Sequence, residues 1–213
     1  MQIVHFGHSC VLVDTGSARL LFDPGTLSAG FDDVRDLDAI LVTHQHFDHL
    51  DVDRLPALVA ANPTARLVVD VGSAAETAKL GLAAEIARPG DTLTLAGTAV
   101  TVVGGAHAVI HPEVEMPPNA GYLVEHGAFY HPGDSLFVPE QEVDVLGLPT
   151  SAPWLKTGEA CDFLRAVAPR VAVPIHQGLF NETGTKLTYG WFSRMAPTGT
   201  EVRPLTPREP AEL

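Results

Sequence analysis

Residues 39–49, which read Ala-Ile-Leu-Val-Thr-His-Gln-His-Phe-Asp-His, decide the interpretation of the whole chain. The first four residues form an apolar run that is typical of a buried strand. Three imidazoles and a carboxylate follow directly, at a strand end, which is where α/β proteins place their chemistry. Neutral imidazole and carboxylate groups suit zinc and its first-row neighbours as ligands. The spacing His-x-His-x-Asp-His therefore indicates a metal site.

The composition is that of a globular domain with a substantial core. The chain has 213 residues, of which 46% are apolar, which suits one large domain. Acidic residues number 26 against 13 basic ones, so the net charge is −13. Nucleic acid is not expected as a partner, because phosphate binding needs clustered Lys and Arg. A small phosphate ester is not excluded, since metal ions would bring positive charge of their own.

The termini and the cysteines indicate a cytoplasmic protein. Residues 1–5 lack the basic segment and the apolar core of a signal peptide. No apolar run approaches the roughly 20 residues that a membrane span needs, so no membrane contact is expected. Cys10 and Cys161 match no zinc-binding or redox spacing. Both are predicted to be buried, reduced and inert thiols.

Hydrophobic periodicity predicts many strands early in each half of the chain, with helices after them. The expected strands are 2–6, 9–14, 19–23, 38–43, 66–70, 82–87, 92–95, 99–103, 121–125, 128–130, 143–148, 171–175 and 201–203. The expected helices are 52–61, 73–80, 158–167 and 189–195. This order predicts an α/β fold in four layers, αββα, with two sheets packed face to face and helices outside. No linker divides residues 1–213, which are treated as a single domain.

Three further residues of the kinds that bind metals each lie at the end of an apolar strand. His107 follows the run 100–106, Asp134 lies in Gly-Asp-Ser, and His176 ends the strand 171–175. Glycines flank all three positions and allow the backbone to approach a crowded site.

The order and rough spacing of these motifs resemble those of the metallo-β-lactamase fold superfamily. The resemblance runs from the first strands to about Gly178. A nearer resemblance is to the small, single-domain, metal-dependent hydrolases of the UlaG-like kind. It rests on Phe6-Gly7-His8-Ser9-Cys10, on Asp23-Pro24 and on the compact length.

The resemblance implies two adjacent divalent metal ions. The first would be held by His44, His46 and His107, the second by Asp48, His49 and His176, and Asp134 would bridge them. Such a pair lowers the pKa of a bound water from about 15.7 towards about 7, so hydroxide exists at neutral pH. Asp48 and Asp134 would orient that hydroxide as well as bind metal. Zinc is the metal expected from the ligand types, and manganese or iron also suits a set without sulfur.

The activity predicted is hydrolysis of an ester, lactone, amide or phosphodiester bond in a small substrate. One alternative is a metal-binding regulatory or sensing protein without turnover. Another is a redox enzyme on the same scaffold, disfavoured because His46 stands where the superfamily's flavodiiron branch has a glutamate. No cysteine occupies a motif position, which disfavours the lactamase branch that uses a thiolate ligand. A homo-oligomer is compatible with the sequence, which does not determine the oligomeric state.

Several residues near these motifs have competing interpretations. Asp23 is either a hydrogen-bond partner of a ligand histidine or a turn-forming residue. His8 is expected to be buried and hydrogen-bonded near the site rather than bound to metal. His111, in the loop after His107, is a candidate proton donor to the leaving group, with a solvated loop histidine as the alternative.

Residues 149–156 are expected to form a wall of the substrate pocket. Within them, Trp154 is predicted to be a core residue, and Lys156 is either an anion-binding group or a surface lysine. His131 is predicted to be structural, and His5 to lie in the core or at a sheet edge.

Overall fold

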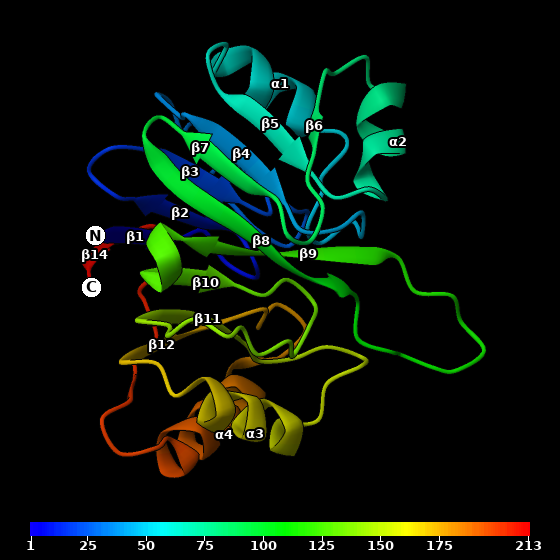
Figure 1. Ribbon diagram of the computed structural model, residues 1–213. Coiled ribbons are helices and arrows are strands. Elements are labelled where there is room, and N and C mark those ends of the chain that lie inside the picture. The colour runs from blue at the N-terminus through cyan, green and yellow to red at the C-terminus, as the bar shows by residue number, and fades with distance from the viewer.

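The chain folds into four layers in the order helix, sheet, sheet, helix. The computed structural model describes residues 1–213. Two seven-stranded sheets pack face to face (Figure 1). Helices α1 (Leu55–Ala61) and α2 (Ser73–Lys79) cover one sheet, and α3 (Thr157–Val167) and α4 (Glu182–Met195) cover the other. The predicted αββα architecture is confirmed.

The first sheet is antiparallel at one side and parallel at the other. Its strands lie in the order β14 (Pro210–Glu212), β1 (Gln2–His5), β2 (Val11–Asp14), β3 (Arg19–Phe22), β4 (Ala39–Val42), β5 (Arg66–Val69) and β6 (Glu85–Ile86). Strands β14 to β3 pair antiparallel, and β3 to β6 pair parallel.

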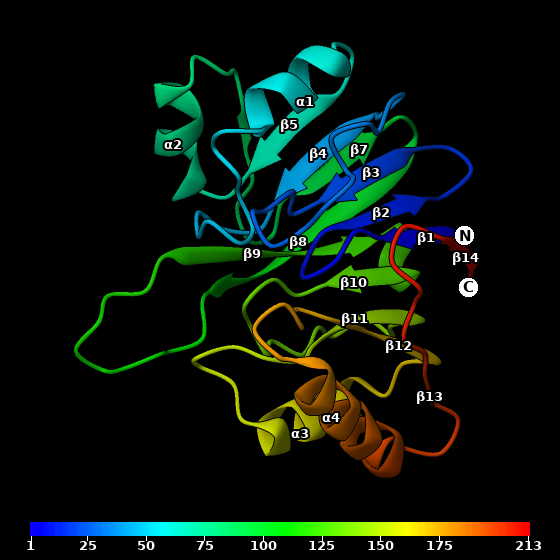
Figure 2. The ribbon, with the colours of Figure 1, turned by 180° about the vertical axis from the view of Figure 1, so that it is seen from behind.

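The second sheet has the same mixed character. Its strands lie in the order β13 (Glu201–Val202), β12 (Val171–Ile175), β11 (Val145–Pro149), β10 (Phe129–His131), β9 (Pro118–Val124), β8 (Thr98–Ala106) and β7 (Thr92–Leu95). Strands β7 to β10 pair antiparallel, with the short 3₁₀ turn Glu125–Gly127 between β9 and β10, and β10 to β13 pair parallel. Figure 2 shows the two sheets from behind.

Alternation along each strand divides the apolar side chains among three clusters. In β3, Leu20 and Phe22 point between the sheets, whereas Leu21 points towards the layer of α1 and α2. Successive strand residues face opposite sides of a sheet, so one apolar run contributes to two packing layers. The cluster between the sheets holds 21 buried residues, and the clusters under the helices hold 13 and 11.

The structure corrects three predicted elements. Helix α4 begins at Glu182 rather than at 189, because Asn181 caps it by accepting a hydrogen bond from the backbone N–H of Gly184. Strand β6 is only Glu85–Ile86 instead of 82–87. The Pro-rich tail contains β14, which pairs with β1 from the far end of the chain. No helix has the length and apolarity that crossing a bilayer requires.

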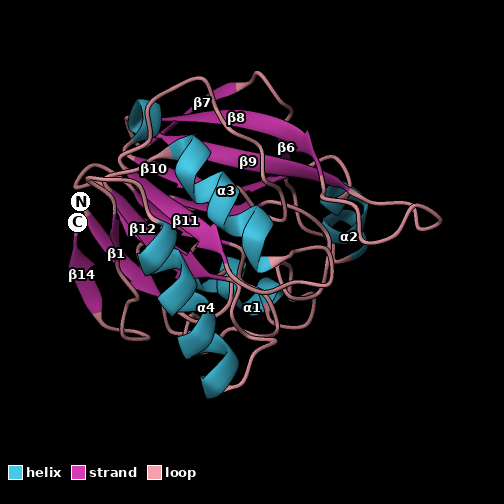
Figure 3. Cartoon of the chain, turned by 90° about the horizontal axis from the view of Figure 1, so that it is seen from below, coloured by secondary structure: helices cyan, strands magenta, loops and turns pink.

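The strand ends of both sheets bring the predicted site residues to one edge of the molecule. The loop after β4 carries the segment His44–His49, and Asp23 follows β3. His107 follows β8, and His176 follows β12. The loop from β8 to β9 extends well beyond the sheets at this edge, and Figure 3 shows it from below.

Tyr122 connects the two sheets through a buried hydrogen bond. Its hydroxyl in β9 donates to the carbonyl oxygen of Val42 in β4, at 2.9 Å. Replacing Tyr122→Phe should lower the free energy of unfolding by about 1–2 kcal/mol, because a buried carbonyl loses its partner. Urea unfolding measures this change. Tyr189→Phe on α4, where no protein group bonds the hydroxyl, should change it by less than about 0.5 kcal/mol; equal effects would contradict the prediction.

Candidate metal centre

The seven ligands predicted from the sequence come together, with His8 as an eighth member, in two adjacent groups. One group is His44, His46, His107 and Asp134, and the other is His8, Asp48, His49 and His176. Within each group the donor atoms lie within 4.8 Å of one another. Every member except the half-buried His46 is buried.

Asp134 lies between the two groups. Its Oδ1 is 3.1 Å from Nε2 of His49 and 3.1 Å from Nε2 of His176. Its Oδ2 is 3.3 Å from Nε2 of His107. One carboxylate oxygen therefore faces each group, which is the arrangement that a bridging ligand requires.

The hydrogen bonds of three histidines leave their inner nitrogens unprotonated in the neutral ring. Nδ1 of His49 donates to Asp23 at 2.6 Å, Nδ1 of His107 to the Ala108 carbonyl at 2.6 Å, and Nδ1 of His176 to the Ser151 carbonyl at 2.5 Å. A neutral imidazole that donates from Nδ1 has its lone pair on Nε2. All three Nε2 atoms point into the centre.

These inward lone pairs fit a bound cation. Nε2 of His49 and Nε2 of His176 are 3.1 Å apart, so two neutral rings would direct lone pairs at each other. Nε2 of His107 and Oδ1 of Asp134 are buried and have no hydrogen-bond partner. Buried polar atoms are rarely left unsatisfied, and a divalent metal would satisfy all four.

Asp23 orients one of the inner histidines, which resolves its two interpretations. Its Oδ2 accepts the Nδ1–H of His49, and its Oδ1 accepts the backbone N–H of Thr43 at 2.7 Å. The Thr43 hydroxyl also donates to Asp23 and lies 3.1 Å from Nδ1 of His44. Such contacts hold the tautomer and ring orientation of metal-binding histidines.

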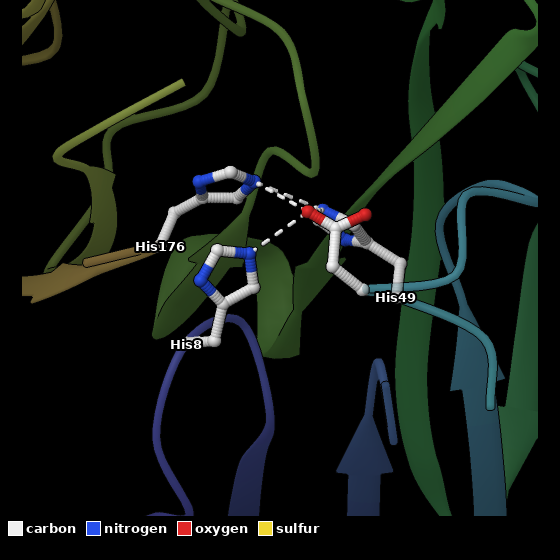
Figure 4. A group of neighbouring side chains, drawn as sticks. His8, His49 and His176 are labelled. Carbon is white, nitrogen blue, oxygen red and sulfur yellow. Dashed lines mark hydrogen bonds and ion pairs between the residues drawn. The ribbon is translucent and has the colours of Figure 1, made fainter. Parts of the chain in front are cut away.

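His8 belongs to the second group by distance, but its hydrogen bonds give it a different part. The backbone N–H of Gly178 donates to its Nδ1 at 3.0 Å, so the proton is on Nε2. Nε2 then donates to Oδ2 of Asp48 at 3.0 Å. Burial lowers the pKa of His8 to about 4, which keeps the ring neutral. Figure 4 shows His8, His49 and His176 converging, and the hydrogen bonds agree with the expectation that His8 is buried and hydrogen-bonded near the site rather than bound to metal.

Trp154 and Asn119 also contact Asp134, and neither contact was predicted. The indole Nε1 of Trp154 donates to Oδ2 of Asp134 at 2.7 Å. Oδ1 of Asn119 accepts the backbone N–H of Asp134 at 3.0 Å, while Nδ2 of Asn119 donates to the Pro132 carbonyl. The only sequence signal for Trp154 was its place after β11, at the same edge as the other donors.

The local field attracts positive charge. Burial alone would lower the pKa of His49, but the carboxylates of Asp134 and Asp23 raise it well above its ordinary value. Burial would raise the pKa of Asp134, but His49 and His176 hold it well below its ordinary range. A proton or a metal ion can provide the positive charge, and the convergent lone pairs favour the metal ion.

The backbone is strained where it delivers these groups. His8, Asp23 and His176 have φ values of 46°, 46° and 60°, in the left-handed region that non-glycine residues avoid. Packing is tight as well, since a Cβ atom on Gly25 would lie 1.8 Å from the carbonyl oxygen of Asp48. Strain of this kind persists only where surrounding packing enforces it.

The other candidates lie away from the donor atoms or support them. His111 is exposed in the β8–β9 loop, where its Nδ1 accepts the Glu113 N–H. His131 is buried and donates to the Ser9 carbonyl, as expected of a structural residue. His5 is buried in β1, and Lys156 is exposed and lies 3.1 Å from Glu159.

Both cysteines, Cys10 and Cys161, carry buried free thiols, as predicted. Burial raises the pKa of both thiols, which keeps them protonated and unreactive.

The fold and the donor arrangement define the class of metallo-β-lactamase fold proteins, and comparison with known sequences agrees. The profile of the beta-lactamase superfamily domain matches residues 2–176. The chain therefore belongs to the beta-lactamase superfamily, as the motif resemblance predicted.

Relatives and solved structures match nearly the whole chain. Protein Rv0786c of Mycobacterium tuberculosis is 50% identical over 208 residues, 96% of this chain and 97% of that protein. A UPF0173 metal-dependent hydrolase of Aeropyrum pernix is 26% identical over 205 residues, 84% of this chain and 83% of that protein. The metallo-beta-lactamase fold protein YhfI of Bacillus subtilis matches with a TM-score of 0.73 and 17% identity, over 99% of this chain and 98% of that one. CmlA, a diiron beta-hydroxylase from Streptomyces venezuelae, matches with a TM-score of 0.79 and 17% identity, over 100% of this chain and 54% of that one.

The burial of His5 should make the folded protein less stable in mild acid. Burial lowers its pKa below the ordinary value, so below about pH 6.5 the unfolded chain binds a proton that the folded chain excludes. Stability should therefore fall as the pH drops from about 6.5 through the folded pKa. His5→Gln, which keeps a donor for the His8 carbonyl, should show a smaller loss between about pH 7.5 and about pH 5.5. Urea midpoints measured in EDTA test this.

The matched control is the exposed His126. His126→Gln should lose as much stability on acidification as the unaltered protein. If His5→Gln loses as much stability on acidification as the unaltered protein, the burial of His5 makes no contribution to the acid sensitivity.

Proposed function

We propose that the protein is a metal-dependent hydrolase that uses two divalent cations to cleave an ester, lactone, amide or phosphodiester bond of a small substrate. The observation that carries the proposal is the convergence of unprotonated imidazole nitrogens on Asp134, with one carboxylate oxygen facing each donor group. Relatives such as the Aeropyrum pernix protein bear the name metal-dependent hydrolase, which supports the same reaction class.

Each residue of the site has a definite part in this proposal. His44, His46 and His107 would hold one cation, Asp48, His49 and His176 the other, and Asp134 would bridge them. Bound there, two divalent cations would supply hydroxide at neutral pH and would stabilise charge on the attacked carbonyl or phosphoryl oxygen.

The surrounding residues would keep the two carboxylates in place for that reaction. His8 directs one oxygen of Asp48, and Trp154 directs one oxygen of Asp134. Fixed carboxylates hold the attacking oxygen in one orientation, which lowers the entropic part of the barrier. We retain His111 as the proposed proton donor to the leaving group, since the loop that carries it begins at His107.

Zinc is the proposed metal, with manganese or iron as alternatives that a nitrogen and oxygen donor set also accepts. A redox enzyme is the competing function, because CmlA shares the fold and is a diiron hydroxylase. His46, in place of a glutamate, favours hydrolysis. A pure sensor is disfavoured because His46 is half-buried and the Asp48 side chain is 13% exposed, which leaves one side open to a substrate. The free thiols support the proposed cytoplasmic location.

Trp154 provides a direct readout of metal binding. The chain has 2 tryptophans, so Trp191→Phe leaves only the indole that donates to Asp134. Adding zinc to this EDTA-treated variant should change its fluorescence, because the acceptor carboxylate becomes a metal ligand. The change should saturate at two equivalents per chain, in agreement with elemental analysis. Trp154→Phe, which retains the half-exposed Trp191 on α4, should not respond. Saturation at one equivalent would contradict the two-metal site.

A substrate panel tests the reaction itself. Generic esters, lactones, β-lactams and bis-aryl phosphates should be assayed with zinc, manganese and iron. We expect hydrolysis of at least one class, and Asp134→Ala should lower its rate by about 10²–10³-fold while circular dichroism shows a folded chain. Asp162→Ala, on the exposed face of α3, should keep the original rate. Unchanged turnover in Asp134→Ala would remove that residue from the mechanism.

A further inference from the structure

Access to the donor groups is confined to one side. His46 is half-buried and 13% of the Asp48 side chain is exposed, whereas the side chains of the other donors are at most 5% exposed. A substrate must therefore reach the centre across the segment 46–48.

The residue between these two donors is a strongly exposed phenylalanine. Phe47 is 63% exposed, and its backbone carbonyl accepts the N–H of Thr26, which ties the segment to the loop after β3. A large apolar side chain in water next to a polar centre is unfavourable by itself. Its position is explained if an apolar group of the substrate covers it.

Exposed apolar side chains come from the neighbouring loops as well. Leu27 lies 3.4 Å from the position that a Cβ of Gly178 would take, and Leu179 and Phe180 follow Gly178 directly. On the opposite flank, Gly72 approaches both Gln45 and Pro118, the residue that closes the β8–β9 loop. Val71 precedes Gly72, and Val109 lies two residues beyond His107. The apolar rim comprises Leu27, Phe47, Val71, Val109, Leu179 and Phe180, all exposed.

Positive charge is scarce on the loops of this edge. The loop after β3, which carries Leu27, contains Arg35, whose guanidinium donates to the backbone carbonyls of Asp32 and Val34. Segments 43–50, 70–72, 107–117, 132–144 and 176–181 contain no Lys or Arg. Lys156 pairs with Glu159, and Arg54 donates to Asp51 at 2.6 Å. The β8–β9 loop carries Glu113 and Glu115, both exposed. An anionic group on the substrate away from the scissile bond would find no Lys or Arg on these five segments and would meet like charge on the β8–β9 loop.

We infer that the substrate is an uncharged ester or lactone whose acyl group is apolar and lies against the apolar rim while the carbonyl faces the donor groups. This inference rests on the proposed hydrolase function and narrows its four bond types. The rim favours an acyl chain or an aromatic acyl group, and the scarcity of basic residues disfavours phosphorylated substrates. Hydrolysis adds one water across the C–O bond and releases the carboxylic acid and the alcohol.

Acyl chain length tests the inference. With p-nitrophenyl esters from acetate to decanoate and the metal-loaded protein, kcat/KM should rise by up to about fourfold per methylene, the factor that corresponds to about 0.8 kcal/mol for each buried CH₂. The matching ester with a terminal carboxylate should be the poorer substrate. Phe47→Ser should flatten the dependence on chain length, whereas Leu187→Ser, an equally exposed residue on α4, should preserve it.

A binding measurement separates this inference from the proposed function. Calorimetric titration with methyl ketones of increasing chain length, which resemble esters but are not hydrolysed, should show binding that tightens with length and weakens in Phe47→Ser. If no ester is cleaved but this binding is found, the hydrolase proposal fails and the apolar rim stands as the binding surface. Hydrolysis with a flat chain-length profile overturns the inference alone, as does the absence of ketone binding. Binding to phosphatidylcholine vesicles that Phe47→Ser abolishes, together with a flat profile, would assign the rim to a lipid surface instead.

Discussion

The geometry of the site depends on holding the lone pairs of two imidazole nitrogens and one carboxylate oxygen close together. Nε2 of His49 and Nε2 of His176 face each other at 3.1 Å, with Oδ1 of Asp134 at the same distance from both. Neutral rings and a carboxylate would separate in the absence of positive charge between them. The surrounding protein prevents this, because Asp23 and the Ser151 carbonyl bind the outer nitrogens of the two rings. A cation turns this repulsion into attraction.

Packing between the two sheets holds the two rings in this unfavourable arrangement. His49 follows a strand of one sheet and His176 a strand of the other, so the inter-sheet cluster of 21 buried residues determines how closely the rings approach. The left-handed backbone at His8, Asp23 and His176 costs about 1–3 kcal/mol per residue and persists because this packing enforces it. The same packing between the sheets therefore determines both the stability of the sandwich and the geometry of the site. The hydrogen bond of Tyr122 between the sheets contributes to both.

Contacts outside the donor set give the site its directionality. His8 donates to Asp48 and Trp154 donates to Asp134, so each carboxylate has one oxygen committed and the rest of its lone pairs free. The opening lies on the side of His46 and Asp48, where Phe47 and the loops beside it present apolar side chains, and the segment 43–50 itself contains no basic residue. The chemistry and the selectivity are thus supplied by different parts of the same loops.

The sequence by itself determined the layers and the donors. Period-two alternation is a local property, so the αββα layers could be predicted from the sequence. The motif from His44 to His49 indicated four donors, and the family resemblance implied the other three, His107, Asp134 and His176. Local signals failed where a distant partner decides, as in β14, which pairs with β1, and in α4, whose start depends on the Asn181 cap. Only the tertiary structure decided that Trp154 reaches Asp134 and that His8 donates to Asp48 instead of offering a lone pair. Those outcomes depend on side chains from separate strands meeting at one edge, and no periodicity along the chain encodes such a meeting.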